Sequence, residues 1–313
     1  MRASLASACC VTGLLLGACW DRGDDAAAKD DPAAVRQAMV AIESALASAR
    51  VDDALKIAQR LVEVAPASAQ AHELLGRALI AKSTEQRDAV AAKPFAVAAW
   101  AAYARAIAVG EPSAGLLNAA AVTAQGAGAT AAAVELFFRA EKADPQSAQH
   151  PLFAGLALHS LARDDEARAA LMRAALIDPD SPWPVAALSS IALAHGDAPQ
   201  ALELVRQARQ LDPTCDELRV TEAKALRALD RHAEVLSLLL ALPESSRFTE
   251  AVTWEIASAH AAMGDRGSAA RARAAFAERS LTAQSALDAA TAWDAAGDAV
   301  QAASWRRVAA ERR

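Results

Sequence analysis

Three Asp-Pro pairs divide the middle of the chain into equal segments. They are Asp144-Pro145, Asp178-Pro179 and Asp212-Pro213, and their positions increase in constant steps of 34. Gly196 and Gly264 are separated by two such steps. Two kinds of marker with the same period indicate a structural unit that repeats along the chain.

Residues 148–181 show what one unit contains. Charged residues Arg163-Asp164-Asp165 separate two stretches, and Pro179 ends the second because proline cannot continue a helix interior. The apolar residues in the two stretches recur at helical spacing: Leu152, Leu156 and Leu158, then Ala167, Leu171, Ala174 and Leu176. The whole chain has 89 alanines but one tyrosine, six phenylalanines and six tryptophans, which favours helices over a sheet. Each unit is therefore predicted to be a helical hairpin, and the fold class all-α.

The spacing and residue order resemble the tetratricopeptide repeat family. The family pattern has a small residue at position 8, alanine at 20, a large apolar residue at 24, alanine at 27 and proline at 32. Three consecutive units, 114–147, 148–181 and 182–215, match all five positions: Ala121, Ala133, Phe137, Ala140 and Pro145; Gly155, Ala167, Leu171, Ala174 and Pro179; Ser189, Ala201, Val205, Ala208 and Pro213. Small residues are needed where helices cross closely, and large ones fill the gaps between them.

Weaker matches extend the pattern to both sides. Units are expected at 35–68, 69–112, 216–249, near 250–282 and at 283–313, and the second of these carries an insertion from Lys82 to Pro94 between its helices. The resemblance implies about eight hairpins over 35–313, stacked as a right-handed superhelical α-solenoid. Residues 299–313 are expected to form a polar helix that caps the open end of the stack.

Residues 1–34 are predicted to be a targeting signal followed by a flexible tether. Residues 1–18 match a signal peptide, and Leu16-Gly17-Ala18-Cys19 resembles the lipobox of bacterial lipoproteins, in which the cysteine carries the lipid. A simple cleaved signal and an uncleaved anchor remain alternatives. Residues 19–34 are charged and lack helical periodicity, so they are expected to be a flexible tether. Because Trp20 rather than aspartate follows the lipidated position, the resemblance implies anchoring in the outer membrane, facing the periplasm.

No residue pattern in the sequence indicates catalysis, metal binding or nucleic-acid binding. The formal charge of −6 without a long basic run argues against nucleic-acid binding. The six histidines are scattered, no metal-ligand or nucleotide-loop pattern occurs, and Cys215 is interpreted as a small buried residue. We therefore expect no enzyme activity, catalytic residue, metal, cofactor or small-molecule substrate.

The resemblance places a binding groove on the first helix of each hairpin, at positions 2, 5, 9 and 12. The main candidates are Asn118, Val122, Gln125, Leu152, Leu156, His159, Trp183, Ser190, Lys224, Arg227 and Trp254. The same register adds Glu43, Glu73, Arg77, Ala186, Leu193, Val220 and Ser258. Trp183 and Trp254 are alternatively core residues, Lys224 and Arg227 are alternatively solvated surface charges, and the 82–94 insertion is either a functional loop or a tolerated one.

A mixed, partly apolar groove suits a segment of a partner protein anchored by aromatic side chains. The sequence is thus interpreted as a lipid-anchored adaptor that binds a protein partner, in the assembly of an envelope complex such as a pilus or a secretion channel. The alternative is an accessory subunit of an envelope enzyme, or an enzyme with poorly marked residues.

Overall fold

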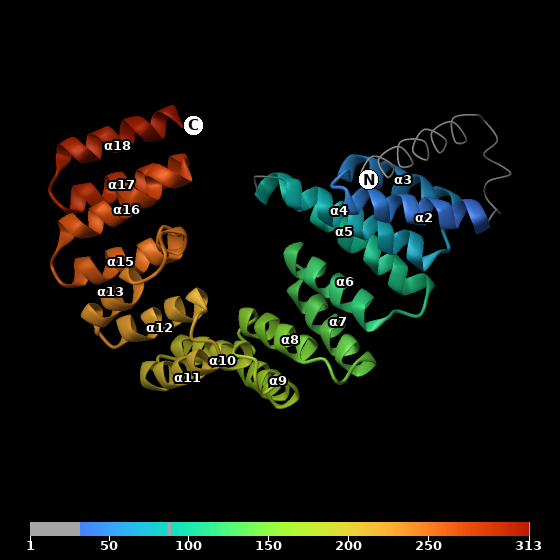
Figure 1. Cartoon of the computed structure of the whole chain (residues 1–313), viewed down its shortest axis with the longest axis horizontal. Helices are drawn as coiled ribbons and strands as arrows, with labels where there is room; N and C mark the ends of the chain where they lie inside the picture. The colour runs from blue at the N-terminus through green and yellow to red at the C-terminus, as the bar shows by residue number, and fades with distance from the viewer. Residues whose placement is uncertain (1–31, 87–88, 313) are drawn as a thin grey trace, which may run out of the picture. The chain divides into compact units, whose positions relative to one another are not determined.

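The computed structural model describes residues 32–86 and 89–312, and this part of the chain contains helices, turns and no strand. The helices group into two compact units, and the chain divides between Arg163 and Asp164. Figure 1 shows successive helices of each unit lying side by side. The predicted signal peptide, Cys19 and nearly all of the predicted tether lie outside the described residues.

The described part of the first unit consists of three helical hairpins and one further helix. In chain order the helices are α2 (Pro32–Ala47), α3 (Val51–Val64), α4 (Ala69–Glu85), α5 (Ala89–Val109), α6 (Ala114–Gly126), α7 (Thr130–Ala143) and α8 (Gln149–Ser160). The first helix begins at Pro32, slightly before the predicted start of the repeats. Each helix packs on the next one along the chain, so the contacts are local in sequence, as in a repeat protein.

The described part of the second unit begins with one helix and continues with four hairpins. Its helices are α9 (Asp164–Ile177), α10 (Trp183–Ala194), α11 (Ala198–Leu211), α12 (Asp216–Ala228), α13 (His232–Leu240), the short α14 (Glu244–Arg247), α15 (Glu250–Ala262), α16 (Arg266–Ser280), α17 (Ala283–Ala295) and α18 (Ala299–Glu311). The predicted starts of the units fall within a few residues of α2, α4, α6, α8, α10, α12, α15 and α17.

One left-handed residue follows the first helix in seven of the eight described repeats. These residues are Ala49, Gly128, Ala162, Gly196, Asp230, Gly264 and Gly297, with φ between 54° and 89°. The N–H of the residue that follows each of them donates to the carbonyl five residues earlier, at 2.8–3.0 Å. This bond satisfies a carbonyl that the helix end would otherwise leave unpaired. From residue 128 to 264 the left-handed position recurs in the same steps as the Asp-Pro pairs, so the sequence period is the period of this turn.

An aspartate after the left-handed glycine starts the second helix in three hairpins. Asp197, Asp265 and Asp298 each accept a hydrogen bond from the backbone N–H three residues later, at 2.9–3.0 Å. The carboxylate thereby pairs one of the N–H groups left open at a helix start. The Gly-Asp sequence therefore ends one helix and begins the next.

Alanine dominates the core, as the composition predicts. The interior of both units alternates buried alanines with single large side chains such as Phe137, Leu171 and Val205. Gly76 on α4 shows why small residues are needed: a Cβ atom there would lie 2.7 Å from the Tyr103 ring of α5. The ring is 3% exposed, and its burial raises the pKa of Tyr103 to about 12.

The insertion from Lys82 to Pro94 was predicted to be a longer loop, and the structure differs. Helix α4 continues to Glu85 and α5 begins at Ala89, so most of the insertion lengthens the two helices. Pro94 lies inside α5, whose neighbouring alanines strongly favour the helix. The Ser83 hydroxyl donates to the Ala92 carbonyl at 3.1 Å and ties the two extensions together.

The last helix, α18, was predicted to be a polar cap, and its capping role stays a prediction. Its buried positions, Ala302 and Ala309, face the preceding helices, while the exposed positions include Gln301, Arg306 and Glu311. Because the two units are separate bodies, the handedness of the whole array stays a prediction.

Candidate functional site

One face of each first helix is open to solvent. Counted from the predicted unit starts, position 9 is exposed in seven of the eight described first helices and half-buried in one. Glu43, Arg77, Val122, Leu156, Ser190, Lys224 and Thr291 are exposed, and Ser258 is half-buried. Position 2 is exposed in all eight, whereas most residues at position 5 are half-buried. We call the residues at positions 2, 5, 9 and 12 of the first helices the first-helix strip.

Four large apolar residues of the first-helix strip are exposed to water. Val122 and Leu156 in the first unit are 49% and 41% exposed, and Trp183 and Trp254 in the second are 45% and 40% exposed. A buried-core role for the two tryptophans is thereby disfavoured. Single exposed apolar residues are common, but these four occupy related places of one repeat. The strip therefore presents apolar anchors at intervals within each unit.

In the first unit, neighbouring first helices bring strip residues together. Arg77 Nη1 of α4 lies 3.5 Å from Glu43 Oε1 of α2. Farther along, Gln125 is exposed and Asn118 is half-buried, and Asn118 Oδ1 has no hydrogen-bond partner among the described residues. Leu152 and His159 of α8 are half-buried. This part of the strip thus presents charged, polar and apolar side chains.

In the second unit, the structure separates two residues that the sequence treats alike. Lys224 of α12 is exposed and forms no ion pair in the described part of the chain. Arg227, on the same helix, donates from Nε to Glu255 Oε2 at 2.7 Å, and the Glu255 side chain is 3% exposed. A buried carboxylate needs such a partner, so Arg227 is required by the core and is not a free cation.

The same guanidinium also orients an exposed aromatic ring. Arg227 Cζ lies 4.9 Å from the centre of the Trp254 ring, within cation–π range. Two candidates from adjacent hairpins, at positions 12 and 5, thus come together as the register requires. Ser190, in contrast, donates its hydroxyl back to the Ala186 carbonyl of its own helix at 3.3 Å.

Beside Trp254 lies a recess of about 270 Å³ between α15, α16 and α17. Its lining consists of Trp254, Ser258, Arg266, Arg273 and the alanines 257, 261, 269, 292 and 295. Arg266 and Arg273 were not among the sequence candidates. The sequence could have identified Arg273, because it occupies position 24 of its unit, where other units have the large apolar residues Phe137, Leu171 or Val205. A charged residue at a position that is apolar in the other repeats indicates a local function.

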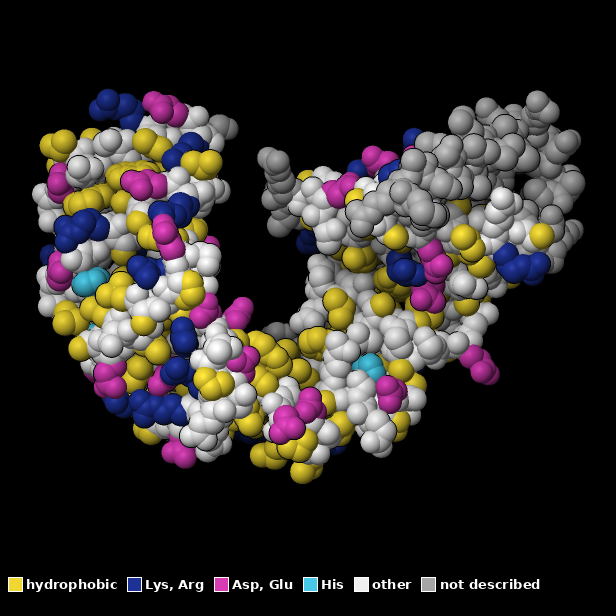
Figure 2. Space-filling model, viewed as in Figure 1, with side chains coloured by type: hydrophobic (Ala, Val, Ile, Leu, Met, Phe, Trp, Pro, Cys, Tyr) yellow, Lys and Arg dark blue, Asp and Glu magenta, His cyan; other side chains and the backbone are white. Residues whose placement is uncertain are grey.

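Lys and Arg side chains are visible among hydrophobic ones over α12 to α18 in Figure 2. Several of these charges are paired. A larger hollow of about 400 Å³ between α11, α12 and α13 is lined by Arg209 and the buried Glu222, which form an ion pair, and by Glu234. Arg206 Nε adds a second bond to Glu222 at 2.9 Å. Because each charged residue of its lining already has an ion-pair partner, we interpret this hollow as structural.

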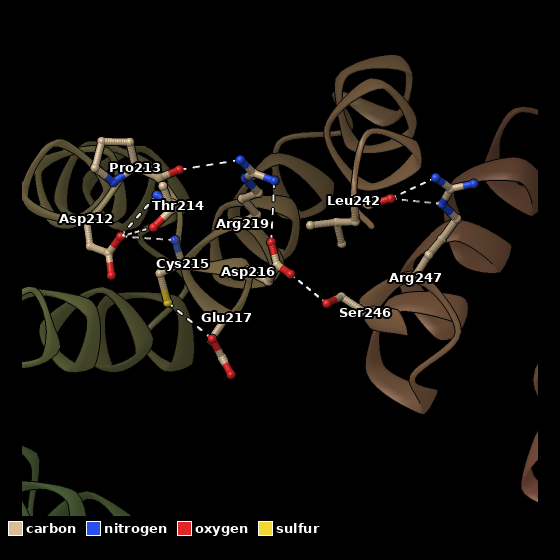
Figure 3. A network of polar contacts seen from close by, with 10 residues as sticks. All are labelled: Asp212, Pro213, Thr214, Cys215, Asp216, Glu217, Arg219, Leu242, Ser246 and Arg247. Carbon is tan, nitrogen blue, oxygen red and sulfur yellow. Dashed lines mark hydrogen bonds and ion pairs between the residues drawn. The ribbon is translucent and has the colours of Figure 1, made fainter. Parts of the chain in front are cut away.

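The thiol of Cys215 has no activating cation beside it among the described residues, and its side chain is half-buried rather than fully buried. Figure 3 shows its Sγ donating to Glu217 Oε2, at 3.2 Å, within a polar network at the start of α12. Burial raises the pKa of Cys215, which opposes thiolate formation. In the same network Ser246 of α14 donates to Asp216 Oδ2 at 2.6 Å, and this bond fixes the short extra helix.

In the part of the chain that the structure describes, no group of three or more His, Cys, Asp or Glu residues is placed to hold a metal ion. No described helix combines the length and the apolar character needed to span a bilayer.

Comparisons with known proteins agree with the repeat geometry. Residues 192–253 match the family model of the tetratricopeptide repeat. The fold is similar to a tetratricopeptide repeat protein from Parabacteroides merdae, with a TM-score of 0.64 and 12% identity over 78% of this chain and 92% of that one. A search of curated proteins finds no match.

Two other solved structures share the fold. YrrB, described as a TPR protein with an unusual peptide-binding site, gives a TM-score of 0.51 and 16% identity over 62% of this chain and 90% of YrrB. PilW, a type IV pilus biogenesis factor, gives 0.54 and 17% over 61% of this chain and 90% of PilW. At these identities the likeness concerns the fold. The described part of the chain is thus an all-α fold built from repeated helix pairs. The tetratricopeptide repeat model matches residues 192–253, and the solved structures share the fold, so the resemblance seen in the sequence is confirmed at the level of the fold.

Proposed function

We propose that this protein is a membrane-anchored adaptor whose first-helix strip binds a segment of a partner protein. The observation that carries the proposal is the exposure of Val122, Leu156, Trp183 and Trp254 at strip positions. Exposed apolar surface is costly in water, and aromatic side chains are frequent anchors of protein interfaces. The peptide-binding site named for YrrB supports the same use of this fold.

The proposal includes an anchor at Cys19 and a location in the cell envelope, facing the periplasm. The lipobox-like Leu16-Gly17-Ala18-Cys19 supports the anchor. The likeness of the fold to PilW supports a role in assembling an envelope machine such as a pilus.

Site-specific photocrosslinking in intact cells tests the binding role. A photoreactive amino acid is placed at position 122, 156, 183 or 254, and as a control at position 172. Met172 is a 56% exposed residue of α9, a second helix, and lies outside the strip. We expect the same partner band from the strip positions and none from position 172. Equal crosslinking from position 172, or no adduct from any strip position, contradicts the proposal.

A further inference from the structure

We propose that the recess between α15, α16 and α17 binds an acidic segment of the partner protein that inserts one large apolar side chain. This inference rests on the proposed function and adds the chemistry of the partner. It is carried by two cations beside an apolar recess, Arg266 and Arg273.

The two arginines have no carboxylate partner among the described residues. Other arginines of the second unit do: Arg279 Nη2 lies 2.8 Å from Glu244, and Arg306 pairs with Asp294. Arg266 is also the first residue of α16, where the helix dipole adds positive potential. The rim of the recess therefore carries positive charge that the described residues leave uncompensated.

The neighbouring acidic groups do not neutralise this charge. Glu255 is buried against Arg227, and Asp294 is paired with Arg306. Asp265 accepts hydrogen bonds from the side chain and the backbone of Ser268 at the start of α16, which keeps the pKa of its carboxyl below the usual range. Glu255 and Asp294 thus have cationic partners, and Asp265 stays charged at the helix start without an ion pair to either arginine of the recess. A bound segment would therefore supply the paired carboxylates.

The interior of the recess fits a side chain and not a larger ligand. Five alanines line it and the Trp254 ring forms one wall. Its volume of about 270 Å³ lies below the range of about 300–1,000 Å³ that is typical of small-molecule pockets. An aromatic or branched apolar side chain would bury its surface here, while carboxylates beside it would form bidentate bonds to the guanidinium groups.

The experiment is selection from a phage-displayed library of random dodecapeptides against the purified full chain. Selected peptides are then synthesised with a fluorescent label and titrated by anisotropy. We expect enrichment of Asp and Glu around one Phe, Trp or Leu, and affinity that falls as salt rises. The double variant Arg266→Ala/Arg273→Ala should weaken binding at least tenfold, and Trp254→Ala should do the same.

The matched control is Arg271→Ala. Arg271 lies on the same helix, is exposed, and donates to the Ser268 hydroxyl at 2.8 Å without lining the recess. It removes the same kind of charge from α16, so a general electrostatic effect would weaken binding in the control as well. Equal weakening overturns the inference.

Two other results distinguish this inference from the proposed function. Selected peptides that lack acidic residues, or that bind the double variant unchanged, overturn the inference and leave the adaptor role intact. If no peptide binds and no crosslink forms, the inference and the adaptor role are both contradicted. A synthetic peptide of residues 20–31, which contains Trp20 and five aspartates, is titrated in parallel. Tighter binding of that peptide than of any selected peptide would make the chain's own segment the occupant and overturn the assignment to a partner.

Discussion

The contact between Gly76 and Tyr103 gives the sharpest test of how the hairpins pack. A Cβ atom at position 76 would lie 2.7, 2.8 and 2.9 Å from three carbons of the Tyr103 ring. Separations below 3.0 Å force one side to move, and the ring is buried among Leu116, Ala106 and Ala120. Gly76→Ala is therefore an overpacking substitution, although it adds only one methyl group.

The size of the effect follows from two opposing contributions. Overpacking a core costs about 1–3 kcal/mol. Replacing glycine by alanine inside a helix gains about 1 kcal/mol of helix propensity. Gly126→Ala is the matched control without the clash: Gly126 is the last residue of α6, where the propensity gain is at most about 1 kcal/mol, and no described atom outside its own helix turn lies within 4 Å of its Cβ position. We expect Gly76→Ala to be less stable than Gly126→Ala by about 1–3 kcal/mol.

Urea denaturation followed by circular dichroism in the far ultraviolet measures both variants. A third variant, Tyr103→Leu, removes the ring atoms, and in that background Gly76→Ala should lose most of its cost. If Gly76→Ala and Gly126→Ala have the same denaturation midpoint, the Tyr103 ring does not pack on α4 and the assigned packing is incorrect.

The remaining predictions concern the turns, the buried ion pair and the anchor. Gly196→Ala should lower the free energy of unfolding by about 1–2 kcal/mol because φ at this residue is +79°, although an added Cβ would meet no described atom within 4 Å outside its chain neighbours. An unchanged thermal midpoint refutes this backbone-strain argument. Because the pKa of Asp265 is lower in the folded state than its unfolded value near 3.8, the ionised carboxylate stabilises the fold at pH values above 3.8. This stabilisation is lost as the pH falls through the lower pKa of the folded state, and Asp265→Asn should flatten that part of the acid-unfolding curve. Arg227→Met should destabilise by about 3 kcal/mol because it leaves the Glu255 charge buried alone, and Arg227→Met with Glu255→Met should recover part of the loss. Cys19→Ser should move the protein from the membrane fraction to the soluble fraction, and unchanged fractionation excludes a lipid anchor at Cys19.

The repeat could be read from the sequence because its causes are local. A left-handed turn at a fixed position, an aspartate that caps the next helix, and small residues at close crossings each leave a mark at one position. These marks recur with the period of the hairpin. The helices of 35–313 and the exposed face of each first helix follow from that register. The 82–94 insertion was interpreted as a loop from its length, but its alanines favour a helix, and the structure has helix over most of it.

The tertiary structure decided which residues of the strip are available. Arg227 and Lys224 lie on the same helix and are equally charged, but only Arg227 meets a buried carboxylate from the next hairpin. Likewise, within the described part of the chain Arg273 is a free cation beside a recess, because the residues around it on α15 and α17 are mostly alanines. Charge pairing and empty volume depend on side chains from different hairpins, and the pattern within one hairpin does not contain that information. The sequence alone determined the hairpin and its register, whereas the packing of one hairpin on the next determined which charges stay free and where a recess remains.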